Sequence, residues 1–305
     1  MIKIKVPATS ANMGPGFDSL GVALGLHNII DVSETDGGFT VVTGRDRRIV
    51  PGRENNLIYM AMNKVFEKAG YVPKGIRIGQ TNNIPTTRGF GSSSACIVAG
   101  MLGANVICGR PFDYREILNM AAAMEGHPDN VTPALFGGFC TTVNDNGKIS
   151  FTSNKLTYPI RFAIMYPDFS MATRDSRKVI PDVFSKEDVV FNISRATTFV
   201  SAMVLGKLDI LKSACQDKIH QEYRKANIPG IENVFEKSYE LGSYATYLSG
   251  SGPSAVSVID AENTDFETEM NKYFEENLKG WKCRVHTIDN VGAVVWESRE
   301  DSNWR

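Results

Sequence analysis

The sequence is poor in cysteine and carries no excess of either charge. Its five cysteines are odd in number, lie far apart and form no CxxC pair, which argues against a disulfide framework and against a structural zinc site. A reducing cytoplasm is therefore the expected compartment. The 33 basic and 34 acidic residues nearly cancel, so no field of one sign is available to gather nucleic acid or an acidic membrane surface.

The sequence also lacks a long hydrophobic run, an internal repeat and a low-complexity tract. Its longest apolar stretch, Ala95–Cys108, is too short to span a bilayer and is interrupted by Asn105 and several glycines. Residues 1–7 alternate polar and apolar side chains, which predicts a strand and not a signal peptide. The 305 residues, of which 42% are hydrophobic, predict about two globular domains with sizeable cores.

Strand-like and helix-like segments alternate along the chain, which predicts a mixed α and β class. The expected strands are residues 2–6, 20–34, 39–43, 75–80, 138–144, 148–153 and 160–166. The expected helices are residues 57–69, 92–108, 113–125 and 231–241, and a long helix after Ser185. A turn-rich loop is expected at 7–18. We place the domain boundary just after the hairpin at 138–153, which gives domains 1–155 and 156–305.

The segment Gly89–Ala95 has two glycines followed by three serines at the start of a helix of small residues. Glycine lets the backbone approach a ligand closely, and the free N–H groups and dipole of a helix start form an anion site. Serine hydroxyls can add hydrogen bonds or bind Mg²⁺. No Gly-Lys-Ser/Thr ending follows, so this is not a Walker loop. Taken alone, a plain helix cap with a flexible lead-in explains the segment equally well.

Three other segments concentrate polar groups beside glycine and proline. Pro7–Asp18 is a long loop after a strand, the kind of loop that often carries a site. Glu125–Asn130 brings carboxylates, a histidine and an amide together, as in an acid–base or metal cluster. Leu248–Ser254 is a glycine-rich turn between two strands. Taken singly, each segment is also explained by a tight connection or a solvated turn.

Together the four segments resemble the GHMP kinases, a family of small-molecule kinases, over nearly the whole chain. Residues 7–21 are similar to the N-terminal motif of that family, and Leu248–Ser254 is similar to its third motif. Pro85–Ala95 is similar to its phosphate-binding loop, P-x-x-x-G-L-G-S-S-x-A.

Three stretches favour the branch of the family that phosphorylates L-homoserine. They are residues 8–18, residues 125–131 and residues 220–230. Four residues depart from the common pattern without removing a group that phosphate contact requires: Met13, Phe90, Ser251 and Ser254.

The resemblance implies an α+β fold of two domains with the nucleotide between them. The first would be similar to domain 2 of ribosomal protein S5, and the second to a ferredoxin-like sandwich. The implied reaction transfers the γ-phosphate of ATP to the side-chain hydroxyl of L-homoserine with Mg²⁺, giving O-phospho-L-homoserine for threonine biosynthesis. Dimers are common in the family, so a homodimer is one expected assembly, although the sequence identifies no interface. Partners among nucleic acids and membranes are not expected.

The resemblance also implies roles for single residues. ATP contacts fall on the loop and the helix that follows it, with one adenine contact further upstream: Pro85, Thr86, Thr87, Arg88, Gly89, Phe90, Gly91, Ser92, Ser93, Ser94, Ala95 and Asn56. Substrate contacts fall on Asn12, Asp18, His127, Asp129, Thr173, Arg177 and Arg224. Within this set, Arg177 and Arg224 match carboxylate-binding arginines, and Asn12 and Asp18 match groups around the amino end. The implied Mg²⁺ ligands are Ser93 and Glu125.

The implied catalytic residues are Ser93, Glu125, Asp129 and Asn130. Asp129 could accept the hydroxyl proton or serve the substrate's ammonium group. We favour a positioning role for Asp129 and Asn130, because a loose transition state needs no early deprotonation. Two rival interpretations stay open: another GHMP kinase, of mevalonate or shikimate type, and a non-catalytic ligand-binding member of the fold.

Overall fold

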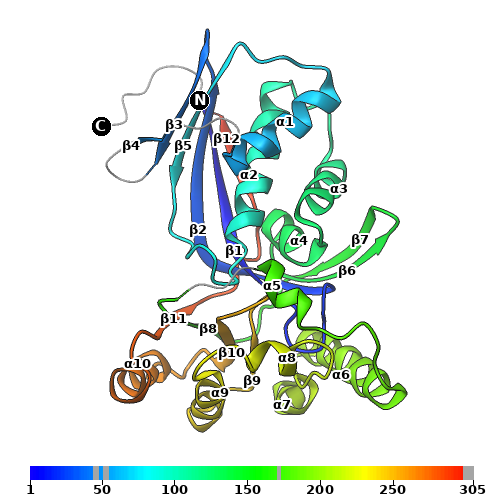
Figure 1. Cartoon of the computed structure of the whole chain (residues 1–305), viewed down its shortest axis with the longest axis vertical. Coiled ribbons are helices and arrows are strands. Elements are labelled where there is room, and N and C mark those ends of the chain that lie inside the picture. Colours follow the sequence, from blue (N-terminus) through cyan, green and yellow to red (C-terminus); the bar gives the residue numbers. More distant parts are fainter. Residues whose placement is uncertain (44–47, 51–54, 170–172, 298–305) are drawn as a thin grey trace.

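The computed structural model describes residues 1–43, 48–50, 55–169 and 173–297, and the side chains of all of these except residues 48–50 and 173–175. Figure 1 shows two parts, each built from one sheet with helices against it. The sheet of the second part faces the first part, and most of its helices lie on the far side. The predicted α+β class is confirmed.

The larger sheet has eight strands. They are β1 (Ile2–Ala11), β2 (Leu20–Glu34), β3 (Gly38–Thr43), β4 (Arg48–Val50), β5 (Gly75–Thr81), β6 (Phe139–Asp145), β7 (Lys148–Asn154) and β12 (Val294–Glu297). Six follow the order β12-β1-β2-β5-β3-β4, and β6 joins β7 to the start of β2. The β3–β5 pair is parallel, and the other pairs in this sheet are antiparallel.

Four helices pack beside this sheet: α1 (Leu57–Ala69), α2 (Ser92–Ile107), α3 (Tyr114–Glu125) and α4 (Pro128–Phe136). The helix α2 is buried on all sides from Ser94 to Asn105, because its small apolar residues let the sheet and the neighbouring helices approach closely. Asn56 and Gly70 cap the two ends of α1, and Asp113 forms a capping box with Glu116 at the start of α3. This packing fixes the first residues of α2 at the edge of the core.

The second sheet has the order β11-β8-β10-β9, made of β8 (Ile160–Tyr166), β9 (Ala245–Leu248), β10 (Ala255–Asp260) and β11 (Lys282–His286). All its pairs are antiparallel, and this is the strand order of a ferredoxin-like sandwich. Its helices are α5 (Thr173–Lys178), α6 (Lys186–Leu205), α7 (Leu211–Ala214), α8 (Gln221–Lys225), α9 (Ile231–Glu240) and α10 (Phe266–Asn277), with a 3₁₀ turn, η1 (Leu208–Ile210), before α7.

Three differences from the sequence prediction concern the first part of the molecule. The strand β1 continues to Ala11, so the expected loop is shorter than predicted, because residues 8–11 pair with residues 21–24 of β2. Residues 128–136 form the unexpected helix α4, which Pro128 begins at its first position. The strand β12 pairs with β1, so the last strand of the described residues completes the first sheet, while the predicted boundary falls between β7 and β8.

The helix α6 is long and apolar enough, by length and composition alone, to span a membrane. Its buried side nevertheless packs against the first part of the molecule. Asn192 donates a hydrogen bond to the carbonyl of Pro15 (3.0 Å), and the ring of Phe199 meets that of Phe139 in β6. These contacts hold α6 against the junction of the two domains.

Candidate active site

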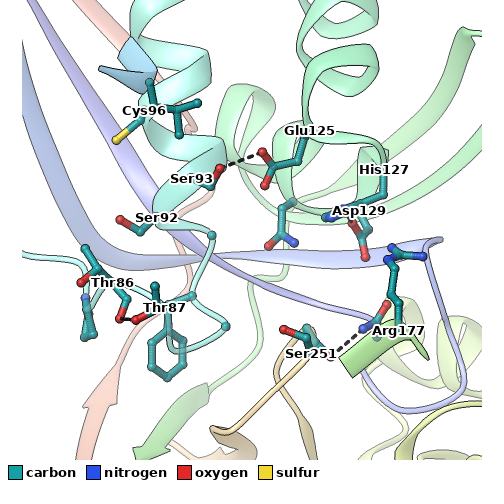
Figure 2. Close-up of a pocket in the computed structure, with 18 of the residues that line it drawn as sticks. Thr86, Thr87, Ser92, Ser93, Cys96, Glu125, His127, Asp129, Arg177 and Ser251 are labelled. Carbon is teal, nitrogen blue, oxygen red and sulfur yellow. Dashed lines mark hydrogen bonds and ion pairs between the residues drawn. The ribbon is translucent and has the colours of Figure 1, made fainter. Parts of the chain in front are cut away.

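A cleft of about 350 Å³ lies between the two domains. Most of the residues that line it come from the segments singled out in the sequence. The complete lining is Asn12, Asp18, Leu57, Gln80, Pro85, Thr86, Thr87, Gly89, Phe90, Gly91, Ser92, Ser93, Cys96, Glu125, His127, Asp129, Asn130, Arg177, Arg224, Gly250 and Ser251. Figure 2 shows hydroxyl groups of the loop and α2 on one side, and His127, Asp129 and Arg177 on the other. The cleft therefore has two ends of different chemistry.

Two glycines of the loop are required by close approach to other chain segments. Gly91 has φ 63°, and a Cβ there would lie 1.9 Å from the Thr9 hydroxyl oxygen. Gly89 has φ 77°, and a Cβ there would lie 2.2 Å from the Ser249 carbonyl oxygen. Both positions exclude larger residues. The loop is thus wedged between β1 and the turn that follows β9.

The helix α2 presents an N-terminus free of internal partners to the cleft. Its first intrahelical bond runs from the Ala95 N–H to the Gly91 carbonyl (2.8 Å), so the preceding backbone N–H groups have no acceptor within the helix. Ser92 and Ser93 line the cleft at this point. Such a helix start attracts an anion through its N–H groups and its dipole.

Glu125 meets this helix start from the end of α3. Its carboxylate accepts hydrogen bonds from the hydroxyls of Ser93 (2.9 Å) and Ser94 (2.9 Å). Figure 2 shows the Ser93–Glu125 bond at the side of the cleft. A hydroxyl and a carboxylate that converge beside an anion site are hard oxygen donors of the kind that Mg²⁺ takes in proteins, so these two side chains fit the predicted ion.

Asp129 and His127 form a close pair at the start of α4. Asp129 is buried, with its Oδ1 2.5 Å from His127 Nδ1. Burial opposes a charge on His127, but the hydrogen bond to Asp129 and the nearby charges of Asp129, Glu125 and Asp18 outweigh it and raise the pKa of His127. Next to this pair, Asn130 accepts a hydrogen bond from the Thr9 hydroxyl (2.7 Å).

Asp18 joins this acidic group and is held by an arginine of the other domain. Ligand atoms of Asp18, His127 and Asp129 lie within 4.8 Å of one another. Arg177 donates two hydrogen bonds to Asp18, at 2.9 and 2.6 Å, and the hydrogen bond to Asp18 raises the pKa of Arg177. A guanidinium so close makes the group a poor site for a metal ion.

Arg224 is a buried cation, with only 2% of its surface exposed. Its Nη1 donates to Gly250 O (2.9 Å) and lies 3.1 Å from His220 Nδ1, and its Nε donates to Ser176 O (3.2 Å). Burial, and then the charge of Arg177, lower the pKa of Arg224 to about 10, so the group stays charged at neutral pH. Among the residues that the structure describes, no carboxylate pairs with Arg224, and Nη2 has no acceptor.

The glycine-rich turn after β9 ties the other segments together. The Ser249 hydroxyl donates to Gly89 O (2.6 Å) and lies 2.8 Å from the Ser10 hydroxyl. Asn12 donates to Gly250 O (2.8 Å), and its side-chain oxygen accepts from the Asp18 N–H (3.0 Å). Asn12 lines the cleft as predicted, but both the nitrogen and the oxygen of its amide already make hydrogen bonds that hold the cleft wall together.

Four predicted ATP contacts are not among the residues that line the cleft. Arg88 turns away to the carbonyls of Pro167 and Asp168, and Ser94 and Ala95 lie within the core. Asn56 is the N-cap of α1, where its side chain accepts from the Tyr59 N–H (3.0 Å). Thr173 begins α5, and its side chain lies outside the described residues.

Sequence reasoning missed three residues at the end of the cleft near the loop. Leu57, Gln80 and Cys96 line it there, and Gln80 donates to the Cys96 sulfur (3.6 Å). Burial raises the pKa of Cys96 to about 11, so the thiol is neutral and unreactive. Gln80 lies near the end of β5 and Cys96 faces it from α2. No spacing in the sequence predicts this contact. Gly250 and Ser251, from the predicted glycine-rich turn, complete the lining.

Comparison with known proteins agrees with this architecture. The chain belongs to the GHMP kinase family: the model of the GHMP kinases N terminal domain matches residues 56–138, and that of the GHMP kinases C terminal matches residues 201–276. Within the family, it belongs with the homoserine kinases. It is 41% identical to a homoserine kinase of Caldicellulosiruptor saccharolyticus over the whole of both chains, and 43% identical to one of Clostridium beijerinckii over 97% of this chain and 99% of that one.

Solved structures give the same result. The crystal structure of homoserine kinase from Cytophaga hutchinsonii superposes with a TM-score of 0.84 at 27% identity, covering 97% of each chain. Mevalonate kinase from Methanococcus jannaschii shares the fold alone, with a TM-score of 0.72 at 14% identity, covering 95% of this chain and 98% of that one. The family and the two-domain fold predicted from the sequence are confirmed.

Proposed function

We propose that this chain transfers the γ-phosphoryl group of ATP to the side-chain hydroxyl of L-homoserine, giving O-phospho-L-homoserine for threonine biosynthesis. The observation that carries the proposal is the pairing of two unlike sites in one cleft. One end has the free helix start of α2. The other end has acidic side chains beside the buried Arg224, which lacks a carboxylate partner in the described part of the chain.

The nucleotide end suits a triphosphate. The loop before α2 and the free N–H groups at its start would hold phosphate oxygens. Mg²⁺, when bound, supplies positive charge to the phosphates, and Ser93 and Glu125 would hold it from the side of the cleft. The adenine would lie toward Leu57, Gln80 and Cys96, where the cleft wall is least charged.

The substrate end suits a zwitterion. The ammonium group would lie against the carboxylates of Asp18 and Asp129, and the carboxylate would take the free Nη2 of Arg224 with help from Arg177. Asp18 and Arg177 form an ion pair with each other in the structure. A zwitterion brings one charge for each of them, so it can replace that ion pair without leaving either charge unpaired.

The state of Asp129 favours positioning over general base catalysis. Its Oδ1 is already paired with His127, whose pKa is raised. That oxygen is therefore already engaged by the imidazole and is not free to take the hydroxyl proton. Phosphoryl transfer through a loose transition state depends mainly on positioning and charge stabilisation. Asp129 would therefore hold the ammonium group, Asn130 would orient the hydroxyl, and the proton would pass late to the phosphate.

A panel of alcohols tests the proposal, with ADP release followed in a coupled assay. L-homoserine should be the preferred substrate. 4-Hydroxybutanoate and 3-aminopropan-1-ol each lack one charge and should turn over poorly, because each leaves one member of the Asp18–Arg177 pair without a partner. Preferred turnover of mevalonate or shikimate would favour the rival kinases. ATP binding with no turnover of any alcohol would favour a non-catalytic member of the fold.

We propose the cytoplasm as the compartment, because its reducing conditions keep cysteines free, as all five are in the structure. The homodimer stays a prediction from the family resemblance.

A further inference from the structure

The contacts of the Arg224 guanidinium fix its direction and leave one nitrogen for a ligand. Its Nε and Nη1 are occupied by Ser176 O, Gly250 O and His220 Nδ1. Two of these three acceptors are backbone carbonyls. The third is a side chain, so it is the contact that a single substitution can remove.

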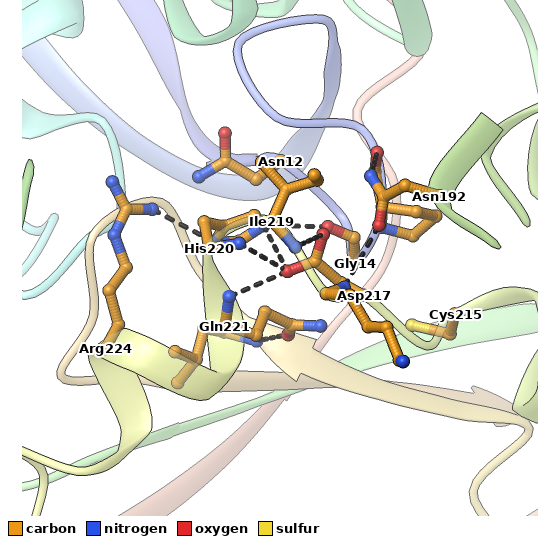
Figure 3. Close-up of polar contacts among 12 residues, drawn as sticks. Asn12, Gly14, Asn192, Cys215, Asp217, Ile219, His220, Gln221 and Arg224 are labelled. Carbon is orange, nitrogen blue, oxygen red and sulfur yellow. Dashed lines mark hydrogen bonds and ion pairs between the residues drawn. The ribbon is translucent and has the colours of Figure 1, made fainter. Parts of the chain in front are cut away.

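His220 is fully buried and lies between two fixed partners (Figure 3). Its Nε2 is 2.8 Å from Gly14 O, and its Nδ1 is 3.1 Å from Arg224 Nη1. A carbonyl oxygen can only accept a hydrogen bond, and a guanidinium can only donate one. Nε2 must therefore carry the proton and Nδ1 the lone pair, so these contacts define the neutral imidazole and its tautomer.

The surroundings of His220 hold the ring in place. Asp217 accepts from the backbone N–H groups of His220 (2.8 Å) and Gln221 (2.7 Å), which fixes the turn at the start of α8, and its Oδ2 lies 3.6 Å from His220 Nε2. The ring of Phe17 stacks on the imidazole with centroids 5.2 Å apart, and the guanidinium of Arg224 lies 5.2 Å from the centroid of the same Phe17 ring. Figure 3 shows Asp217, His220 and Arg224 joined in one network.

We propose that His220 is a positioning residue for substrate binding: its neutral imidazole accepts a hydrogen bond from Arg224 and so aims the free Nη2 at the substrate carboxylate. This role rests on the proposed function, since it requires a substrate that bears a carboxylate. His220 would then influence the affinity for homoserine although it touches neither the substrate nor the nucleotide. A protonated His220 could not accept this hydrogen bond, because its Nδ1 would then carry a hydrogen and two donors would face each other.

The rival role is structural: His220 would merely tie the loop at Gly14 to α8. Two substitutions separate the two contacts. His220→Asn puts an amide oxygen near the place of Nδ1, which keeps the acceptor for Arg224 and loses the donor to Gly14. His220→Gln puts an amide nitrogen near the place of Nε2, which keeps the donor to Gly14 and removes the acceptor from its place beside Arg224.

The KM for L-homoserine, the KM for ATP and kcat are measured for the parent and both variants, with homoserine affinity by calorimetry. His220→Gln should raise the KM and Kd for homoserine by about 10- to 100-fold, the effect of one hydrogen bond to a charged group. His220→Asn should stay within about threefold of the parent, a small fraction of that effect. The ATP KM and most of kcat should be retained in both. His286→Asn, in β11 and away from the cleft lining, is the matched control and should change none of these.

A larger homoserine effect in His220→Asn than in His220→Gln, or equal losses in kcat and both KM values, would overturn the positioning role and leave the structural one. The ¹⁵N NMR signals of the imidazole in the parent protein give a readout that needs no variant to fold. They should show a protonated Nε2 and an unprotonated Nδ1, and the opposite tautomer or a doubly protonated ring at neutral pH contradicts the proposal. If the parent itself does not phosphorylate homoserine, the proposed function fails first, while the NMR result still reports on the contact.

Discussion

Replacing Arg224 by methionine should damage homoserine binding far more than replacing Arg177. Arg224 is 2% exposed and has no carboxylate partner within the described residues, so its loss leaves a buried substrate carboxylate without its cation. Removing one partner of such a buried contact costs about 2–5 kcal/mol. Because about 1.4 kcal/mol corresponds to a factor of ten, Arg224→Met should raise the homoserine KM by about 30- to 4000-fold.

Arg177 provides the internal comparison. Its side chain is 39% exposed and is already held by Asp18. Its loss also frees Asp18 for the ammonium group, and solvent screens the missing charge. Partly exposed ion pairs contribute about 1 kcal/mol or less, so Arg177→Met should raise the homoserine KM by about tenfold at most.

Coupled ADP release, with homoserine and ATP varied in turn, gives both KM values for each variant. Thermal unfolding by circular dichroism checks that each variant is folded. Both variants should keep the ATP KM of the parent. If Arg177→Met has the larger effect, the burial argument is wrong, and if Arg224→Met raises the ATP KM instead, Arg224 belongs to the nucleotide end.

Three further predictions concern the other residues of the cleft. Glu125→Gln and Ser93→Ala should each lower kcat strongly while homoserine still binds, and near-normal turnover of Glu125→Gln at saturating Mg²⁺ would contradict the metal assignment. Asp129→Asn should raise the homoserine KM and keep much of kcat; a collapse of kcat with unchanged KM, if chemistry limits the rate, would identify Asp129 as the base, whose loss costs about 10²–10⁴-fold. The pKa of His127 is raised in the folded protein, so its pairing with Asp129 stabilises the fold. This stabilisation is complete at a pH below the ordinary histidine pKa of about 6.5, and it is lost as the pH rises through the higher pKa of the folded state. The Tm difference between the parent and His127→Gln should therefore shrink from about pH 6 to about pH 9, and a difference that grows with pH would refute the pairing.

Much of the fold could be predicted because local patterns and tertiary packing agree. The helix α1 begins and ends at the predicted residues, since Asn56 caps one end and Gly70 takes a left-handed conformation at the other. The strand β2 has the predicted bounds. The helix α4 could not be found in this way, because its nine residues include two prolines and polar groups that also suit a turn. The return of β12 to β1 depends on a pairing nearly 300 residues apart, which no local pattern encodes.

The cleft shows the same division. The motif segments identified most of its lining, and the structure brings together Asp18, Asp129 and Arg224 as the resemblance implies. The sequence could not show that the amide of Asn12 is fully hydrogen-bonded within the cleft wall, or that Arg88 points to the backbone of a neighbouring loop. It also could not show Gln80 facing Cys96. These facts depend on where side chains point after distant segments have packed, and residue type alone does not determine that.

The most direct test of the central claim is ³¹P NMR of the purified protein with ATP, Mg²⁺ and L-homoserine. A new phosphomonoester signal that matches O-phospho-L-homoserine should appear and grow in step with ADP. Formation of inorganic phosphate and ADP without that signal, or no change in the ATP signals, would contradict it.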